Sequence, residues 1–264
     1  MADASSSRER MRDLKNRLID EQRSKTTAAN AKGCRALVSL VLRITHPDSR
    51  LGRKLDACGK RNPRNDSRVF CEHPACAVCM RRHGAWLFVD RLFPALETVP
   101  PAQLRWITVL MFRCGDLDDG ACEMGRQIRR LRHILAKLAG GAGASRARKI
   151  RVWGAKEVVR EGDQWLFHVH MLVDLAGSEP STLAGVLRDA WGRGAKQVQV
   201  KPMLQRSHRL NIFRLSEYMT KARYSSVVGG RHLWWTNSEI AAVALWRDHQ
   251  PAQWHRFTFG VRGA

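Results

Sequence analysis

Two histidines separated by one residue are the first candidates for chemistry in this chain. They lie in the segment Phe167-His168-Val169-His170-Met171. Side chains on a β-strand alternate between its two faces, so both imidazoles point to one face and the apolar residues point to the other. Two imidazoles one strand repeat apart can bind a single cation. Chance alone gives about 0.4 such pairs in a chain with ten histidines, so a hydrogen-bonded or solvent-facing pair is the alternative.

Glu157 supplies a carboxylate beside this pair if the intervening sequence folds as a hairpin. Glu161-Gly162-Asp163 is a turn signal between two β-prone segments. A hairpin at this turn places Glu157 near His168 on the neighbouring strand. One carboxylate and two imidazoles form a facial three-ligand metal site, which leaves positions for water and a phosphate oxygen. The alternative is a surface glutamate that balances neighbouring basic residues.

Tyr218 and Lys221 form a second candidate pair, on a helix predicted over residues 210–224. Residues three apart on a helix share a face. A phenol with a pKa of about 10 is a weak nucleophile at neutral pH, and a nearby ammonium or metal stabilises its phenolate. Tyr224 is the other tyrosine, and on such a helix it lies about 120° away from Tyr218 around the axis. The alternative for the pair is a half-buried tyrosine beside a solvated lysine.

A cluster of cysteines precedes these residues in the chain. Four of the seven cysteines have the spacing C-x12-C-x4-C-x2-C, at Cys58, Cys71, Cys76 and Cys79. Zinc thiolate sites combine a tight Cys-x-x-Cys pair with a second pair at looser spacing. The segment has little apolar periodicity and needs something other than burial to order it. We therefore predict a structural zinc site, in which His73 or His83 could replace one cysteine. The clustering also favours a reducing cytoplasm over disulfides.

The elements that must position these residues follow from hydrophobic periodicity. In chain order they are a strand at 106–112, a helix at 122–138, strands at 150–159 and 165–175, a helix at 181–191, a strand at 196–203 and the helix at 210–224. This order predicts an α+β fold, in which an antiparallel sheet has a split βαβ layout with helices on the sheet faces. A further helix is predicted at 81–96, within the small Cys-rich zinc module.

Four parts follow along the chain. They are a polar and basic N-terminal tail (1–33, with a linker at 24–32), a Cys-rich zinc-binding and helical module (34–100), the sheet domain (101–224) and a Trp-rich C-terminal segment (225–264). The sequence does not indicate how the last of these packs.

The charge of the chain indicates its partner class. Forty-six Lys and Arg against 24 Asp and Glu give a net charge of +22 and a pI near 10.9, which favours a polyanion such as DNA over the substrate of an ordinary metabolic enzyme. The candidate phosphate-binding residues are Arg81, Arg82, Arg129 and Arg130, and a solvated helical face is the alternative for each. The chain has no apolar stretch long enough to span a membrane and no secretory signal, which predicts a cytoplasmic protein without a membrane partner.

Three short segments, in this order, resemble the motifs of HUH endonucleases. They are Trp106-Ile107-Thr108-Val109-Leu110, then His168-Val169-His170, then Tyr218-Met219-Thr220-Lys221. Upstream, Cys76-Ala77-Val78-Cys79-Met80-Arg81-Arg82 resembles the Cys-x-x-Cys-x-Arg-Arg leader of one family of rolling-circle plasmid replication initiators, the Rep proteins. The resemblance covers about residues 55–224, and the order and spacing of the motifs carry it.

This resemblance implies a fold and an activity. The 101–224 domain would be an RRM-like HUH endonuclease domain in a bacterial cytoplasmic protein. His168 and His170, with Glu157 as third ligand, would bind Mg²⁺ or Mn²⁺ to polarise a scissile DNA phosphate. Tyr218 would attack that phosphate, leaving a 5′-phosphotyrosine and a free 3′-hydroxyl primer, and Lys221 would stabilise the developing charge. Origin DNA, duplex and single-stranded, would be the partner, with a host helicase and polymerase.

One departure and two alternatives remain. Some of these initiators have a glutamate four residues before the tyrosine that activates water to end the cycle. Here that position is Arg214, Glu217 immediately precedes the tyrosine, and Tyr224 is a candidate second nucleophile. A relaxase or transposase would use the same HUH site for another purpose. A non-catalytic, zinc-containing DNA-binding protein would carry the His pair and Tyr218 incidentally.

Overall fold

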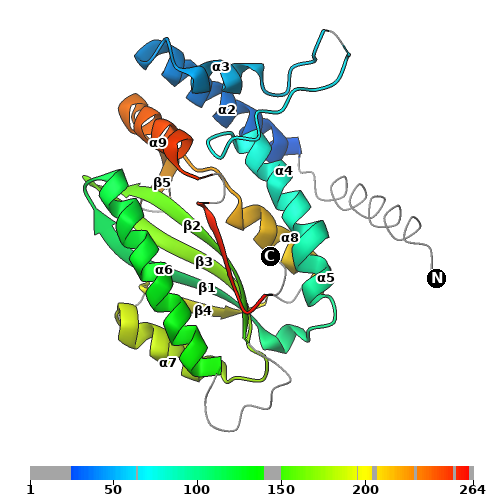
Figure 1. The fold of residues 1–264 in the computed structure, drawn as a ribbon, viewed down its shortest axis with the longest axis vertical. Coiled ribbons are helices and arrows are strands. Elements are labelled where there is room, and N and C mark those ends of the chain that lie inside the picture. Colours follow the sequence, from blue (N-terminus) through cyan, green and yellow to red (C-terminus); the bar gives the residue numbers. More distant parts are fainter. Residues whose placement is uncertain are drawn as a thin grey trace, which may run out of the picture. The chain divides into compact units, whose positions relative to one another are not determined.

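The structure is a computed structural model that describes residues 25–63, 65–139, 150–194, 196–203, 207–228, 231–251 and 254–261. The chain forms two compact units, and Figure 1 labels helices and strands of both. Unit 1 comprises Met1–Leu96, Ile212–Ala222 and Thr236–Asp248, and unit 2 comprises Glu97–Asn211, Arg223–Trp235 and His249–Ala264. The stretch that carries Tyr218 therefore belongs to unit 1, with the Cys-rich segment, and not to the sheet unit. Most of the tail predicted over 1–33 lies outside the described residues.

Unit 2 is built on a five-stranded antiparallel sheet. Its strands are β1 (Leu104–Cys114), β2 (Arg151–Glu161), β3 (Gln164–Asp174), β4 (Val198–Pro202) and β7 (Arg256–Phe259). Their order in the sheet is β4-β1-β3-β2-β7, so β3 lies between β1 and β2. This confirms the predicted α+β class and its antiparallel sheet. The edge strand β7 comes from the C-terminal segment, whose packing the sequence left open.

The central hairpin forms where the sequence predicts it. Gly162 adopts a φ of +62° between β2 and β3, a conformation that glycine accepts without a steric penalty. The resulting register places Glu157 directly opposite His168. In β1, a register shift between Leu110 and Phe112 interrupts the pairing with β3 just beyond His168. The turn and the hydrophobic alternation together fix which side chains share a face of the sheet.

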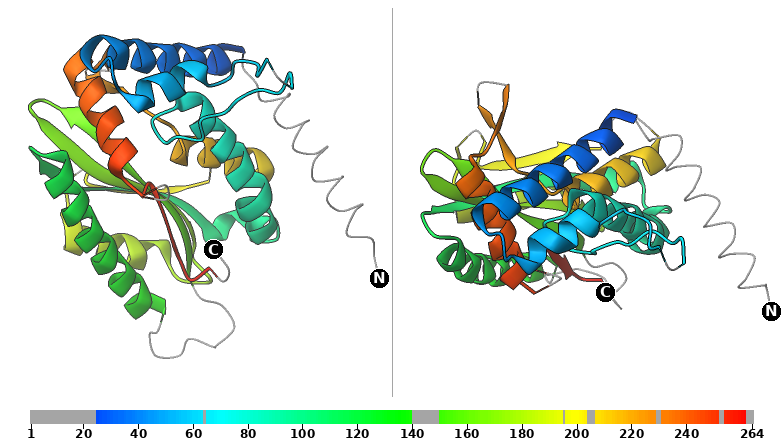
Figure 2. Two further views of the ribbon diagram at one scale, coloured as in Figure 1. Left: turned by 45° about the horizontal axis from the view of Figure 1, so that its top comes forward. Right: turned by 90° about the horizontal axis from the view of Figure 1, so that it is seen from above.

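Two helices cover one face of this sheet (Figure 1 and Figure 2). They are α6 (Leu117–Ala139) and α7 (Pro180–Trp191). Asp116 begins α6, since its Oδ1 accepts hydrogen bonds from the backbone N–H groups of Asp118 and Asp119. The buried side of α6 carries Met124, Ile128, Leu131 and Leu135 at helical spacing. Gly120 of α6 lies against the ring of Phe167, because a Cβ there would come within 2.1 Å of that ring. Phe167 therefore points toward α6, and its neighbour His168 points to the opposite face.

A second, two-stranded sheet in unit 2 consists of β5 (Ser225–Val228) and β6 (Arg231–Trp234). Trp235 attaches this hairpin to the end of the main sheet. Its ring makes edge contacts with Trp165 and Tyr224, and its Nε1–H donates to Ser226 Oγ at 2.8 Å. Tyr224 is only 1% exposed in this packing, which indicates a core position for the residue considered as a second nucleophile.

Unit 1 is helical. It contains α2 (Lys25–Thr45), α3 (Arg50–Ala57), α4 (Ala77–Leu87), a π-helical turn (Phe88–Leu92), α5 (Phe93–Leu96), the part of α8 (His208–Met219) from Ile212 onward, and most of α9 (Asn237–His249). The linker predicted at 24–32 is wrong, because helix α2 already begins at Lys25. The helix predicted at 81–96 begins earlier, at Ala77.

The helix predicted over 210–224 is wrong at its C-terminal end. Helix α8 ends at Met219, and the hydroxyl of Thr220 donates back to the carbonyls of Ser216 and Glu217. Such side-chain bonds compete with continuation of the helical backbone. Lys221 therefore lies two residues beyond the helix and does not share a helical face with Tyr218. None of the helices in the described part of the chain has the length and apolar character needed to cross a membrane.

Candidate functional site

Glu157, His168 and His170 come together on the face of the sheet opposite α6. Glu157 Oε2 lies 3.1 Å from His168 Nε2 and 2.9 Å from His170 Nε2, and the two imidazole nitrogens are 3.1 Å apart. All three residues are buried, and the hairpin register alone brings them into contact. The predicted grouping of these residues is therefore confirmed.

The spacing of these three atoms fits a metal ion. In octahedral coordination with bonds of about 2.1 Å, adjacent ligands lie about 3.0 Å apart, since the ligand–ligand edge is √2 times the bond length. The three observed distances, 2.9 to 3.1 Å, match that edge. The group can thus hold a metal ion through one triangular face of its coordination sphere.

Protonation of the group also suits a cation. Burial by itself raises the pKa of Glu157, but the hydrogen-bonding contacts with the His168 and His170 imidazoles and the charges of His168 and Arg223 hold that pKa well below its ordinary value. Burial lowers the pKa of His170, against the opposing pull of Glu157. A carboxylate and a neutral imidazole are the charge states in which these two residues bind a metal ion.

Three further side chains hold this group in place. Thr108 Oγ1 lies 2.9 Å from His170 Nδ1, and when it accepts that N–H the lone pair of the ring stays on Nε2, toward Glu157. Trp106 stacks on the His170 ring with centroids 5.5 Å apart and planes 8° from parallel. Arg223 Nε lies 3.2 Å from Glu157 Oε1, the oxygen that faces away from the imidazoles. Each ligand except His168 therefore has an orienting partner among the described residues.

Sequence reasoning missed these orienting roles. Thr108 and Trp106 lie in a segment already selected for its resemblance, and both alternate onto one strand face, but their proximity to His170 depends on the β1–β3 pairing. Arg223 was overlooked because it was placed inside a helix. No local pattern indicates its ion pair with Glu157, which is 66 positions away.

Basic residues accompany the group on the same face of the sheet. Arg256 of β7 pairs with Ala155, which in turn pairs with His170, and directly opposed residues point to the same face. Lys201 of β4 pairs with Trp106 in the same way. These two cations therefore flank the group on either side, where they favour an anionic ligand such as a phosphate.

Arg129 and Arg130, predicted to bind phosphates, lie elsewhere. Both are exposed on α6, which covers the other face of the sheet. The guanidinium of Arg130 lies 5.3 Å from the centre of the Trp191 ring. Their contact with DNA stays a prediction, and it would involve the surface behind the Glu157 group rather than the group itself.

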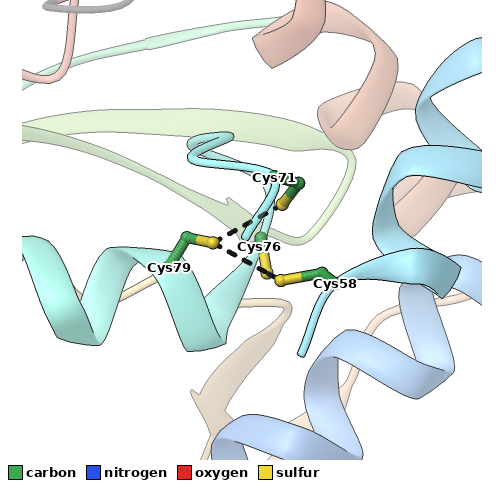
Figure 3. A group of neighbouring side chains, drawn as sticks. All are labelled: Cys58, Cys71, Cys76 and Cys79. Carbon is green, nitrogen blue, oxygen red and sulfur yellow. Dashed lines mark hydrogen bonds between the residues drawn. The ribbon is translucent and has the colours of Figure 1, made fainter. Parts of the chain in front are cut away.

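The four cysteines predicted to bind zinc form a second group, in unit 1 (Figure 3). Cys58 follows α3, Cys71 lies in the connecting loop, and Cys76 and Cys79 lie at the start of α4, with the four side chains directed toward one another. Cys58 Sγ is 3.6 Å from Cys76 Sγ and 3.5 Å from Cys79 Sγ, and Cys71 Sγ is 3.5 Å from Cys79 Sγ. None of these cysteines is in a disulfide, and the group can hold a metal ion.

The cysteine group has the dimensions of a tetrahedral thiolate site. Bonds of about 2.3 Å from zinc to sulfur place the sulfur atoms about 3.8 Å apart in a regular tetrahedron, close to the observed 3.5–3.6 Å. Hydrogen bonds from Cys71 and Cys76 lower the pKa of Cys79, and the backbone N–H of Glu72 also donates to its sulfur at 3.2 Å. This environment favours the thiolate, the form that binds metal.

Neither histidine considered as a replacement ligand joins the cysteine group. His73 has both ring nitrogens engaged, because Nε2 lies 2.9 Å from Asp248 Oδ1 and Nδ1 accepts a hydrogen bond from the N–H of Ala75 at 3.0 Å. Among the described residues, the four cysteine sulfurs are the metal-ligating atoms that converge here, and His83 is not one of the ligands.

The remaining predicted site residues lie in unit 1 and carry their own contacts. Tyr218 is in the last turn of α8, and Lys221 follows the helix. Arg81 Nε lies 3.3 Å from Glu217 Oε1, and Arg82 lies over the ring of Phe70, 3.5 Å from its centre. The convergence of Tyr218 with the Glu157 group, and contacts of Arg81 and Arg82 with DNA, stay predictions.

Comparison of the chain with protein-family models, curated proteins and solved structures finds no match.

Proposed function

We propose that this protein is a metal-dependent, site-specific DNA endonuclease and strand transferase with a tyrosine nucleophile, which initiates rolling-circle replication of a plasmid. The observation that carries the proposal is the buried Glu157, His168 and His170 group, whose three ligand atoms lie 2.9–3.1 Å apart. Arg223, Arg256 and Lys201 add positive charge to the same site, as a phosphate substrate requires.

The strand order supports the finer classification of the fold. With β3 between β1 and β2, and with α6 and α7 on one face, the first four strands have the order β4-β1-β3-β2. The same order is expected of a split βαβ sheet, so it supports the proposal of an RRM-like HUH domain. The histidine pair lies on the central strand, facing away from the helices, so the sheet itself would serve as the platform for the DNA backbone.

The proposed chemistry exchanges one phosphodiester for another. A divalent ion such as Mg²⁺ or Mn²⁺ held by the three ligands would polarise a non-bridging oxygen of the scissile phosphate. Tyr218 Oη forms a bond to phosphorus as its phenolic proton passes to solvent. The bond from phosphorus to the 3′-oxygen breaks, and that oxygen takes up a proton to become the free 3′-hydroxyl primer. The 5′-phosphate stays on the tyrosine, so a second hydroxyl can later displace it and close a circle.

The sequence separation between Tyr218 and Arg223 sets an upper limit on the distance from Tyr218 to the metal ligands. Arg223, which pairs with Glu157, follows Tyr218 by five residues. Five residues span at most about 18 Å when fully extended. This separation allows Tyr218 to reach the metal ligands, as the proposal requires, and the adduct test below decides whether it does. Lys221, between the two, would approach the same phosphate.

Zinc is proposed for the four-cysteine group. Its sulfur-only ligand set and near-tetrahedral spacing favour Zn²⁺ over Mg²⁺ or Mn²⁺, which prefer oxygen ligands. No fifth side chain in the described residues joins the group, and the four sulfurs would fill the four ligand positions of a zinc ion. A closed set of this kind serves structure rather than catalysis.

The test is the formation of a covalent adduct between the protein and DNA. Single-stranded oligonucleotides that tile the DNA around the protein's own gene are incubated with the protein and Mn²⁺, and adducts are resolved on denaturing gels. We expect one oligonucleotide to give an adduct, with the label on Tyr218 by mass spectrometry. Tyr218→Phe should abolish the adduct and leave oligonucleotide affinity within twofold of wild type.

Three results would contradict the proposal, each in a different part. An adduct formed by Tyr218→Phe at the wild-type rate would exclude this nucleophile. Specific DNA binding without nicking, in protein shown to bind Mn²⁺, would favour the non-catalytic zinc-containing DNA-binding protein. Transfer of the nicked strand into a foreign duplex, instead of its recircularisation, would indicate a transposase with the same site.

A further inference from the structure

The four-cysteine group and the helix that carries Tyr218 are connected through one helix of unit 1. Helix α4 begins at the cysteine group, with Cys76 at its N-terminal cap and Cys79 in its first turn. Eight residues beyond Cys76, the same helix packs against α8 at Gly84. The position of α4 is thus set at one end by the cysteine group, and its other end contacts the segment that carries the proposed nucleophile.

The contact at Gly84 is close enough to fix the distance between the two helices. A Cβ at this position would lie 2.4 Å from Thr220 Oγ1, 3.1 Å from the Cα of Glu217 and 3.2 Å from the carbonyl oxygen of Ser216. Two of these three atoms belong to the backbone of α8 and cannot move aside as a side chain would. Only glycine lets the helices approach this closely, and the contact surrounds Tyr218 in the sequence, from two residues before it to two residues after it.

An ion pair fixes how α8 lies along this contact. Arg81, one turn before Gly84, places its Nε 3.3 Å from Oε1 of Glu217, the residue immediately before Tyr218. Both side chains are about three-quarters buried, at 22% and 25% exposure. Because adjacent residues on a helix point about 100° apart, holding Glu217 against α4 directs Tyr218 away from that contact.

We propose that the cysteine group, Gly84 and Arg81 form a positioning device for the Tyr218 helix, so that metal bound by the cysteines governs the rate of the tyrosine reaction. The inference rests on the proposed function where it is tested by the rate of adduct formation. Its structural test, by hydrogen exchange, depends on unit 1 alone. Arg81 and Glu217 are positioning residues, and neither contacts the reacting atoms. A displacement of about 1 Å in a nucleophile can cost about 100-fold in rate, which sets the scale of the effect.

The kinetic test compares four variants in a single-turnover adduct assay with zinc-loaded protein, Mn²⁺ and saturating oligonucleotide. Arg81→Ala and Glu217→Gln should each lower the rate of adduct formation about 10- to 100-fold, with oligonucleotide affinity within twofold of wild type. The exchanged pair, Arg81→Glu with Glu217→Arg, should recover at least a tenth of the wild-type rate. Arg53→Ala is the matched control, because Arg53 is an exposed arginine of unit 1 whose Nη1 donates to the carbonyl oxygen of Asp48 at 3.2 Å, and its rate should stay at the wild-type value.

Two kinetic results would overturn the inference. If Arg81→Ala forms the adduct at the wild-type rate, the ion pair does not position the nucleophile. If affinity for the oligonucleotide falls in parallel with the rate, Arg81 is a DNA contact, as its sequence position first suggested. Both positions are altered in the exchanged pair. If its rate of adduct formation recovers, the loss in the single variants comes from the broken ion pair and not from loss of folding.

The structural test needs no nicking activity and uses hydrogen exchange of backbone amides in protein without DNA. Arg81→Ala should raise the exchange rate of residues 212–219 at least tenfold, and so should removal of zinc with a chelator. For Arg81→Ala, the buried residues Val38 and Leu42 of α2 are the comparison, and their exchange rates should change less. If wild-type protein forms no adduct and these exchange changes occur, the positioning stands and the nuclease proposal fails. If exchange in 212–219 is unaltered by both changes, the positioning is wrong whatever the activity.

Discussion

Thr108→Val tests whether one hydroxyl prepares His170 to bind metal. In the structure the hydroxyl oxygen lies 2.9 Å from Nδ1 of a buried imidazole. When it accepts the Nδ1 proton, the lone pair of the ring is on Nε2, 2.9 Å from the Glu157 carboxylate. His168 has no corresponding partner on its Nδ1 among the described residues, so Thr108 is the main control on the tautomers of the pair.

The size of the effect follows from the burial of the ring. A buried N–H that loses its acceptor costs about 1–3 kcal/mol, and each 1.4 kcal/mol changes an affinity about tenfold. Valine is nearly the same size as threonine but cannot accept the proton. The imidazole then favours the other tautomer, whose Nε2–H donates to Glu157 and occupies the position of the metal. We expect Mn²⁺ to bind about 10- to 100-fold more weakly.

The stability of the metal-free variant distinguishes a change of His170 tautomer from a general loss of folding. In metal-free protein the alternative tautomer gains a hydrogen bond to Glu157, so the free energy of unfolding in urea should stay within about 1 kcal/mol of wild type. Mn²⁺ affinity is measured by calorimetry on zinc-loaded protein, and Thr108→Ser, which keeps the hydroxyl, is the control. Mn²⁺ affinity of the valine variant within twofold of wild type would refute the role of Thr108.

Three further predictions concern packing, thiol chemistry and the cysteine group. Gly120→Ala should lower the free energy of unfolding by about 1–3 kcal/mol, because its Cβ would overlap the Phe167 ring. Gly125→Ala on the same helix should not destabilise, because its Cβ would make only an ordinary contact with Arg129 Nη1 at 3.8 Å. Equal stability of the two variants in urea would contradict this. Burial raises the pKa of Cys34 to about 11, so at pH 8 only about 0.1% of it is thiolate, against about 9% for a thiol of pKa 9. Its reaction with a maleimide should be at least 100-fold slower than that of exposed Cys122 and should accelerate up to pH 11, whereas equal rates at pH 8 would exclude the buried position. Elemental analysis should find one zinc per chain and none in Cys79→Ser, and retention of zinc by that variant would exclude the four-sulfur site.

The central sheet and its three-ligand group could be predicted from the sequence because short-range rules fix both. Alternation along β3 decides which face His168 and His170 share, and the turn at Gly162 decides that Glu157 opposes His168. The cysteine group likewise follows from local spacing, since Cys76 and Cys79 lie in one helical turn. In the sheet the relevant contacts are joined by a tight turn, and in the cysteine group they span at most 21 positions.

The errors arose where contacts over long sequence separations decide the local structure. No glycine or proline lies between residues 210 and 224, so periodicity carried the predicted helix past Met219, whereas the chain turns there toward β5. The predicted helix therefore includes Arg223, whose ion pair with Glu157 the sequence did not predict. The pairing of β7 with β2 joins positions about 100 residues apart, and no pattern in either strand specifies the other.

The course of the backbone also constrains how the protein can be dissected. The chain passes from one unit to the other five times, near residues 96, 211, 222, 235 and 248. A fragment that stops at residue 211 would retain every proposed metal ligand but lose α9, Tyr218 and the arginine that neutralises Glu157. Synthesis on the ribosome meets the same constraint, because the helical unit cannot be finished until nearly the whole polypeptide has emerged. Neither half is therefore available by simple truncation, and independent expression would require rejoining segments in a new order.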